Sequence, residues 1–255
     1  MRITFLGTGT SQGVPVIACQ CDVCKSSDPK DKRLRTSALI ETDGGKNILV
    51  DIGPDFREQM LREHVTHIDS ILISHAHRDH VAGIDDIRPL NYFQQQKMEI
   101  YGNTEALTQL QRDYAYIFEP HIYPGLPEVE LHILSGDETF SAAEETIVPI
   151  KAMHKDLPIL GYRIGKLAYI TDANYISPQE MEKLEDLNVL VINALRKEKH
   201  FSHFCLPEAL EVINQVHPRE AYLTHMCHDI GFYAVTNKEL PPHVHLAYDG
   251  LRVEV

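Results

Sequence analysis

The chain has 255 residues, of which 43% are apolar, and its formal net charge is −13. This length suits one domain over residues 1–255, and no window approaches the roughly 18 apolar residues of a membrane span. The segment Met1–Gly7 meets a glycine too early for a secretory signal, so we expect a cytoplasmic protein with no membrane contact. The acidic charge argues against nucleic acid as a partner, because phosphate backbones are repelled at long range.

Short apolar runs alternate with segments of helical periodicity, which predicts a mixed sheet covered by helices. The turn Asp43-Gly44-Gly45 is typical of a hairpin. Strands are expected at Arg2–Leu6, Ala38–Glu41, Asn47–Asp51, Ser70–Ser74, Glu99–Tyr101, Ile147–Lys151, Leu160–Ile164, Leu167–Thr171, Val189–Asn193 and Ala221–Thr224. Helices are expected at Phe56–Glu63, Ile84–Asn91, Thr104–Tyr114, Pro178–Leu187 and Pro207–Val216. Tyr114–Pro127, rich in aromatics and proline, is expected to form a loop or a cap beside the site.

A cluster of thiols lies near the start of the chain, at Cys19, Cys21 and Cys24. Clustered thiols in a cytosolic chain indicate metal binding more than a disulfide framework. Because a closed structural zinc site takes four ligands, a fourth must come from elsewhere. His228 is our first choice and Cys227 the alternative, and a third interpretation is reduced cysteines with no metal. Cys205 is expected in the core.

The strongest motif follows the apolar run Ile71-Leu72-Ile73, where a buried strand gives way to a loop. It reads Ser74-His75-Ala76-His77-Arg78-Asp79-His80. Imidazole and carboxylate groups suit zinc, manganese or iron. Four such groups on one turn do not all fit a single open tetrahedral ion, so the motif predicts two ions that share the loop. The alternative is a solvated histidine-rich loop, which the buried run before it disfavours.

The motif resembles the metallo-β-lactamase superfamily, whose pattern is His-x-His-x-Asp-His after a strand. The resemblance implies an αββα sandwich in which two mixed sheets are flanked by helices. Further matches follow apolar runs, at Asp51, His154, Asp172 and His225. The resemblance then implies one ion on His75, His77 and His154 and a second on Asp79, His80 and His225, with Asp172 bridging them. Asp51 is expected either to orient a histidine or to cap the turn before Pro54.

The cysteine loop narrows the resemblance to the phosphodiesterase of the carbon–phosphorus lyase pathway. Proteins of pyrroloquinoline quinone biosynthesis share a similar loop. The implied activity is hydrolysis of a small phosphodiester, cyclic substrates included, by hydroxide activated between two metal ions about 3.5–4 Å apart. The implied cofactors are those two divalent ions and one structural zinc, and a homodimer is a weaker implication.

Asp79, Asp172 and His203 are expected to take part in the chemistry. His203 lies between the predicted strand Val189–Asn193 and the helix that follows, and it is our candidate for protonating the leaving oxygen. Its alternative role is a polar turn together with His200.

Competing functions share the fold and the metal motif. They are the tRNA 3′-processing ribonuclease, a thioester or lactone hydrolase, and a biosynthetic protein such as the quinone-pathway relative. The ribonuclease carries a basic, glycine-rich arm for tRNA, and no such insertion is found here.

Overall fold

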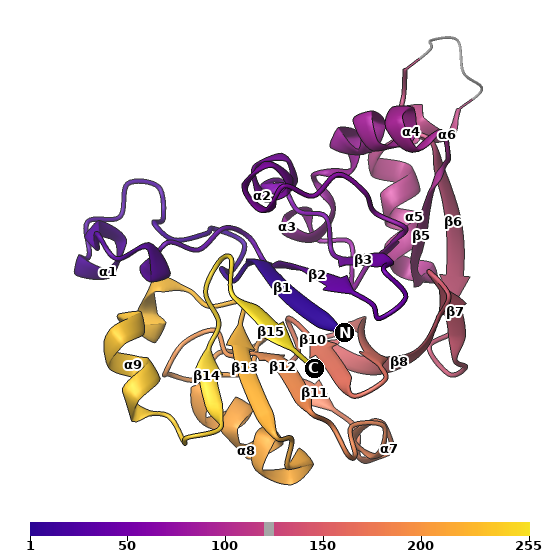
Figure 1. The fold of residues 1–255 in the computed structure, drawn as a ribbon. Coiled ribbons are helices and arrows are strands. Elements are labelled where there is room, and N and C mark those ends of the chain that lie inside the picture. Colours follow the sequence, from indigo (N-terminus) through magenta and orange to yellow (C-terminus); the bar gives the residue numbers. More distant parts are fainter. Residues whose placement is uncertain (120–124) are drawn as a thin grey trace.

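The computed structural model describes residues 1–119 and 125–255, whose strands form two sheets with helices on the outer faces (Figure 1). The first sheet contains β1 (Arg2–Gly7), β2 (Ser37–Glu41), β3 (Asn47–Val50), β4 (Ser70–Leu72), β5 (Met98–Asn103), β6 (Val129–Leu134) and β15 (Arg252–Glu254). The second contains β7 (Phe140–Ala142), β8 (Glu145–His154), β9 (Leu157–Ile164), β10 (Leu167–Ile170), β11 (Tyr175–Ile176), β12 (Val189–Asn193), β13 (Glu220–Thr224) and β14 (Val244–Leu246).

The two sheets share a pattern. In the order β15-β1-β2-β3-β4-β5-β6, the pairs up to β3 are antiparallel and the rest are parallel. In the order β11-β8-β9-β10-β12-β13-β14, the pairs up to β10 are antiparallel and the rest are parallel. The parallel strands therefore end at one edge of each sheet, and loops from both sheets can meet there.

Helices cover the outer face of each sheet (Figure 1). A further layer of buried apolar side chains fills the space between the sheets. Residues such as Ile3, Phe5, Tyr162 and Tyr169 are buried in that middle layer. The α-helices are α1 (Asp22–Lys25), α2 (Phe56–Glu63), α3 (Arg78–Val81), α4 (Arg88–Gln94), α5 (Thr104–Asp113), α6 (Ala115–Phe118), α7 (Pro178–Glu182), α8 (Leu206–Val216) and α9 (Tyr233–Glu239). The αββα fold class predicted from the sequence is confirmed.

Most predicted elements are present, with small changes at their ends. Helix α2 has the predicted bounds because Phe56, Gln59 and Met60 bury one helical face. The predicted helix Pro178–Leu187 is shorter, since α7 ends at Glu182. Of the loop or cap expected at Tyr114–Pro127, the first part forms α6, and residues 120–124 lie outside the described residues.

The glycine-rich start of the chain lies against the loop after β13. Gly9 forms bridges with Arg35 and Met226, and a Cβ at Gly9 would lie 2.8 Å from the carbonyl oxygen of Arg33. Only glycine allows this approach. Within the described residues, none of the helices has the length and apolar character needed to cross a membrane.

Candidate metal centre

Three of the predicted site residues occupy the position directly after a strand or one residue beyond it. Asp51 follows β3, Asp172 comes shortly after β10, and His225 follows β13. Each has a left-handed backbone, with φ of 60°, 60° and 55°. A left-handed conformation is uncommon for residues other than glycine and is often kept at functional sites. In each case the left-handed backbone directs the side chain from the end of the strand toward the space between the sheets.

These strand ends bring together a mostly buried group that we call the histidine–aspartate cluster. Its members are His75, His77, Asp79, His80, His154, Asp172, His203 and His225. Asp172 is central: its Oδ1 lies 2.9 Å from His225 Nδ1, and its Oδ2 lies 3.4 Å from His80 Nε2 and 3.7 Å from His75 Nε2. His77 Nδ1 lies 3.0 Å from His75 Nε2 on the exposed side of the cluster.

The ligand atoms fall into the two sets that the sequence predicts. One set is His75, His77 and His154, and the other is Asp79, His80, Asp172 and His225. Within each set the candidate atoms all lie within 4.8 Å of one another. Asp172 contacts members of both sets, which is the arrangement a bridging carboxylate needs.

Four imidazole rings are held from the side that faces away from the cluster. Their outer nitrogens contact Ser74 Oγ at 3.0 Å (His75), Asp51 Oδ2 at 2.6 Å (His80), Thr10 Oγ1 at 3.1 Å (His225) and the carbonyl oxygen of Asp172 at 2.8 Å (His154). His154 Nδ1 also donates to the carbonyl of Ser202 at 2.9 Å. Fixing one ring nitrogen leaves the other to face the cluster, as in metal-binding histidines.

Of the two roles expected for Asp51, orienting a histidine and capping the turn before Pro54, the structure supports the first. It is fully buried, and its carboxylate accepts hydrogen bonds from His80 Nδ1, the Ser74 amide and the Ser74 hydroxyl. Ser74 in turn contacts His75. One carboxylate thus fixes the orientation of two neighbouring histidines.

Two buried ring nitrogens without hydrogen-bond partners give independent support for a pair of divalent ions in the cluster. His80 Nε2 and His225 Nδ1 are buried and have no hydrogen-bond partner within the described residues. Both nitrogens lie within 3.5 Å of a carboxylate oxygen of Asp172, but not with the angles of a hydrogen bond. A shared ion satisfies such nitrogens and oxygens together.

Electrostatics in the cluster are strong because the groups are buried together. Burial lowers the pKa of His75 well below its usual value, and His80 lowers it further. Burial also opposes the charged form of His80, but the carboxylates around it, Asp172 first, raise its pKa well above the usual value. Burial disfavours ionised Asp172, yet the histidines outweigh this, so its pKa stays well below the usual range. The surrounding histidines thus favour the ionised form of Asp172, which is the form that binds cations.

His203 reaches the same cluster from the segment between β12 and α8, as predicted. Its Nε2 lies 3.4 Å from Asp172 Oδ2, and its Nδ1 lies 3.0 Å from the Ser202 hydroxyl and 3.2 Å from His200 Nδ1. His203 also groups with His154 and Asp172 at metal-ligand spacing. The geometry thus places His203 within the histidine–aspartate cluster, next to Asp172.

The second predicted site forms on the N-terminal loop. Sγ atoms of Cys19, Cys21 and Cys24 lie 3.4, 3.3 and 3.4 Å from His228 Nδ1. The four residues form a group at metal-ligand spacing, whereas Cys227 Sγ accepts a hydrogen bond from the amide of Asp229. The geometry thus favours His228 over Cys227 as fourth member. Cys205 is buried at the start of α8, as expected.

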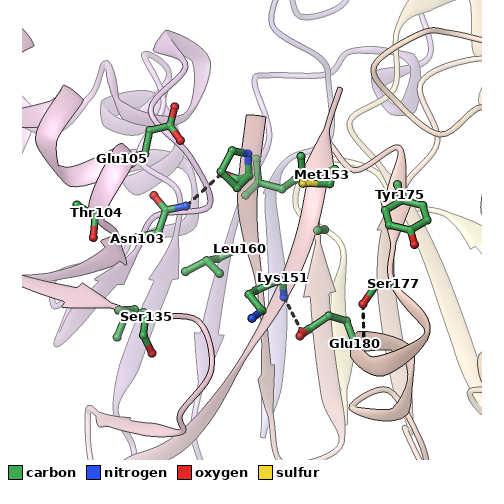
Figure 2. A pocket seen from close by; sticks show the side chains of 14 residues that line it. Asn103, Thr104, Glu105, Ser135, Lys151, Met153, Leu160, Tyr175, Ser177 and Glu180 are labelled. Carbon is green, nitrogen blue, oxygen red and sulfur yellow. Dashed lines mark hydrogen bonds between the residues drawn. The ribbon is translucent and has the colours of Figure 1, made fainter. Parts of the chain in front are cut away.

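Cavities surround the histidine–aspartate cluster. One of about 490 Å³ is partly lined by Asp79, and one of about 220 Å³ by His75 and His77. A third, of about 470 Å³, lies next to the latter (Figure 2). Asn103 lines both of these and donates to the carbonyl of Pro158 at 3.1 Å. None of the predicted metal ligands lines the third cavity, so it neighbours the site rather than forming it.

Sequence reasoning missed several residues around the cluster. Thr10, Ser74 and Ser202 contact ligand histidines, but Ser202 does so through its carbonyl, which carries no side-chain signal. Arg35 and Arg78 line the cavity beside Asp79. Arg78 lies within the sequence motif His75–His80, and this position could have indicated that it lies near the cluster.

Comparison with known proteins places these features in a family context. Residues 46–226 match the family described as the beta-lactamase superfamily domain. A solved diphosphatase of the PhnP family is 38% identical, and the match covers 100% of this chain and 97% of that one, with a TM-score of 0.92. Zinc-bound PqqB from Methylobacterium extorquens has the same fold, with a TM-score of 0.81 at 16% identity over all of both chains.

A curated relative is longer than this chain. An octanoyltransferase from Porphyromonas gingivalis is 41% identical over 98% of this chain but only 51% of its own length. The chain therefore spans about half of that relative.

Proposed function

Since the chain belongs to the beta-lactamase superfamily and is PhnP-like, we propose that it is a metal-dependent phosphodiesterase that hydrolyses small phosphate diesters. The observation that carries this proposal is the histidine–aspartate cluster around Asp172, in which four imidazoles are oriented from behind. The fold and a hydrolase relative 38% identical support the coarser description, a metal-dependent hydrolase. The narrower statement, that the substrate is a phosphate diester, is our proposal.

The proposed ligands are those predicted from the sequence. His75, His77 and His154 would hold one ion, Asp79, His80 and His225 would hold the other, and Asp172 would be shared by both. When bound, two divalent ions supply a hydroxide at neutral pH and offset negative charge on phosphoryl oxygens. The chain's own residues orient this pair: Asp51 fixes His80, and the Ser202 carbonyl fixes His154.

His203 is proposed to hold the proton that the leaving alkoxide needs. Its Nδ1 is fixed by the Ser202 hydroxyl, so its Nε2 is the atom that faces the cluster. A general acid must lie within hydrogen-bond reach of the leaving oxygen. Nε2 lies 3.4 Å from Asp172 Oδ2, so an ester bound over Asp172 would place its leaving oxygen near this nitrogen.

Cys19, Cys21, Cys24 and His228 are proposed to hold a structural zinc. Thiolate and imidazole ligands in a closed set of four are typical of such sites. His225 and His228 share one loop, so this zinc would tie the N-terminal loop to the loop that carries a catalytic ligand.

Two other activities receive less support. The octanoyltransferase relative is about twice as long as this chain, so its name does not assign octanoyl transfer to the matched half. For tRNA processing, the net charge of −13 and the lack of a basic arm in the sequence are unfavourable.

Turnover of matched substrates tests the proposal. Protein prepared without chelator should contain two to three metal ions per chain and hydrolyse bis(4-nitrophenyl) phosphate far faster than 4-nitrophenyl phosphate. The monoester can chelate both ions through its terminal oxygens without presenting its ester bond. Efficient cleavage of a tRNA precursor or of a thioester, with no action on small diesters, would overturn the proposal. So would full activity with less than one ion per chain.

A further inference from the structure

The cavity of about 470 Å³ lies between the first and the second sheet, next to the cavity that His75 lines (Figure 2). Asn103 at the end of β5 and Thr104 at the start of α5 line one side of it, and Tyr175 of β11 lines the opposite side. Side chains of β8 and β9, Met153 among them, lie between these two walls. We call this space the Tyr175 cavity.

The Tyr175 cavity adjoins the proposed metal centre through shared walls. Asn103, Glu105 and Pro158 line both this cavity and the smaller one that His75 lines. The side chain of Asn103, which donates to the carbonyl of Pro158 at 3.1 Å, marks the junction between the two. A substrate held at His75 can thus place a substituent in the Tyr175 cavity.

A row of three side chains across the second sheet leads from Tyr175 to this junction. Tyr175 pairs with Met153 between β11 and β8, and Met153 pairs with Pro158 between β8 and β9. Residues paired in this way lie on the same face of a sheet, and neighbouring strands are about 4.8 Å apart. The row therefore spans about 10 Å, from an edge strand to the wall shared with the cavity of His75.

The charges around the Tyr175 cavity favour a neutral occupant. Glu105 and Glu180 are the acidic residues of its described lining, and Lys151 is the basic one. Lys151 Nζ pairs with Asp137, and Glu180 Oε2 lies 2.7 Å from Lys183 Nζ. Because the lysine of the lining is already paired and Glu105 is an exposed carboxylate, a phosphate group is disfavoured here.

The surface of the cavity combines an apolar floor with polar edges. Its floor includes buried Leu134, Ile159 and Leu160. At the edges, the hydroxyls of Ser135 and Ser177 accept hydrogen bonds from backbone amides at 3.2 and 3.4 Å, which leaves each O–H able to donate to a ligand. Tyr175 is 54% exposed and offers a ring face for stacking. An alkyl chain would match the floor alone, whereas a heteroaromatic ring would match the floor, the ring face and the donors.

We propose that the Tyr175 cavity binds a neutral heteroaromatic group of the substrate, of the size of a nucleobase, while the phosphodiester faces the histidine–aspartate cluster. This proposal rests on the proposed phosphodiesterase function and narrows its substrate class. Tyr175 stacks on the ring, and the side chains of β8 and β9 cover its edge. The preferred substrate is then a small diester that carries a base, and Tyr175 is a specificity-determining residue.

Equilibrium binding tests the proposal without relying on turnover. The probes are adenosine 5′-phosphate, ribose 5-phosphate and octyl phosphate, titrated calorimetrically into the metal-loaded protein. All three carry the same phosphate, so their Kd values differ only through the remainder of the molecule. Stacking of a base on an aromatic side chain is worth about five- to 100-fold in affinity. We therefore expect adenosine 5′-phosphate to bind about tenfold or more tightly than either of the other probes.

Variants of Tyr175 locate the preference in the cavity. Tyr175→Ala should remove most of it and change the Kd of ribose 5-phosphate less than about twofold, whereas Tyr175→Phe keeps the ring face and should retain it. Tyr92→Ala is the matched control, since Tyr92 is an exposed tyrosine on α4 outside both cavities. Equal binding of adenosine 5′-phosphate and ribose 5-phosphate by the wild type would overturn the proposal. So would a preference that survives Tyr175→Ala, an equal weakening of all probes by that variant, or octyl phosphate as the tightest ligand.

Failure of this proposal and of the proposed function are distinguishable. If small diesters are hydrolysed but the base does not improve binding, only the Tyr175 cavity loses its role. If the preference exists and depends on Tyr175 while no diester is hydrolysed, the base site stands and the phosphodiesterase assignment falls.

Discussion

The histidine–aspartate cluster and the cysteine group differ in what holds them together. The first is buried at strand ends, and contacts on the outer sides of its rings fix its histidines. The second joins the N-terminal loop around the short helix α1 to the single 3-10 turn that begins at His228, and its thiols lie 3.3–3.4 Å from one imidazole nitrogen. The fold therefore positions the first set, whereas the second set would close its loop chiefly through the zinc ion that we propose for it.

Thiol chemistry points the same way. The backbone N–H of Cys24 lowers the pKa of Cys21 to about 7, while burial raises the pKa of Cys24 to about 11. A metal ion would bind both thiols as thiolates, despite this difference in pKa. From this comparison we propose that the first group carries the chemistry and the second contributes stability, and four variants test that division.

The largest expected effect follows from Asp172→Ala. Asp172 contacts histidines of both proposed ligand sets, so its loss should reduce kcat/KM for bis(4-nitrophenyl) phosphate by about 1,000-fold or more, the worth of several kcal/mol of charge stabilisation. Tm should change by only a few degrees, since the cysteine group is untouched. An unchanged kcat/KM would contradict the catalytic role of Asp172. So would a large drop in Tm in a variant that still binds both ions.

His203→Ala should give the next largest effect, and its size should depend on the leaving group. General acid catalysis contributes about 100-fold or more, so a ribosyl or other alkyl leaving group should show that loss. Nitrophenol departs as a stable anion, so its ester should lose much less. His200→Ala is the matched control because His200 contacts His203 but is not proposed as the donor.

Two other outcomes would change the role of His203. An equal loss with both leaving groups would mean that His203 positions the substrate. Loss of metal in the variant would make it a ligand, as its 3.4 Å approach to Asp172 allows.

Asp51→Asn should weaken the binding of the two proposed catalytic ions and leave zinc binding by the cysteine group unchanged. Asp51 accepts from His80 Nδ1 at 2.6 Å and is fully buried. Loss of such an orienting carboxylate typically costs about 10- to 100-fold in metal affinity. Competition with a chelator measures this affinity, and the zinc of the cysteine group in the same sample is the internal control. Unchanged affinity at the catalytic pair would mean that Asp51 serves only the fold.

The sequence predicts which residues gather in the histidine–aspartate cluster, because most of them lie close after a buried strand. The apolar runs that become β4, β10 and β13 are visible in the sequence, and the fold places their ends at one edge. Helix α3 was missed because its residues were interpreted only as ligands. Strands β6 and β15 were missed because they lie at sheet edges with little burial; Ile133 in β6 is 64% exposed.

Contacts made by the backbone or across the fold could not be predicted. His154 is oriented by two carbonyl oxygens, which every residue has. Arg35 lines the cavity beside Asp79 from the segment before β2, and its Cβ and the Asp79 carbonyl pack against the same glycine, Gly53. Ligand identity is thus a local property of this sequence, while ligand orientation is a property of the assembled sheets.

Cys21→Ser should have the smallest effect on activity and the clearest effect on stability. Cys21 is exposed and lies outside the histidine–aspartate cluster, so kcat/KM should fall by less than about fivefold once the folded fraction is accounted for. Loss of a structural zinc should lower Tm by roughly 10 °C, because ion binding contributes directly to folding. Cys227→Ser is the matched control, since this thiol lies nearby but outside the group of four. Equal changes in both variants would show that the cysteine group holds no zinc. A loss of activity at unchanged Tm would mean instead that the N-terminal loop acts in catalysis, and the division between the two groups would fail.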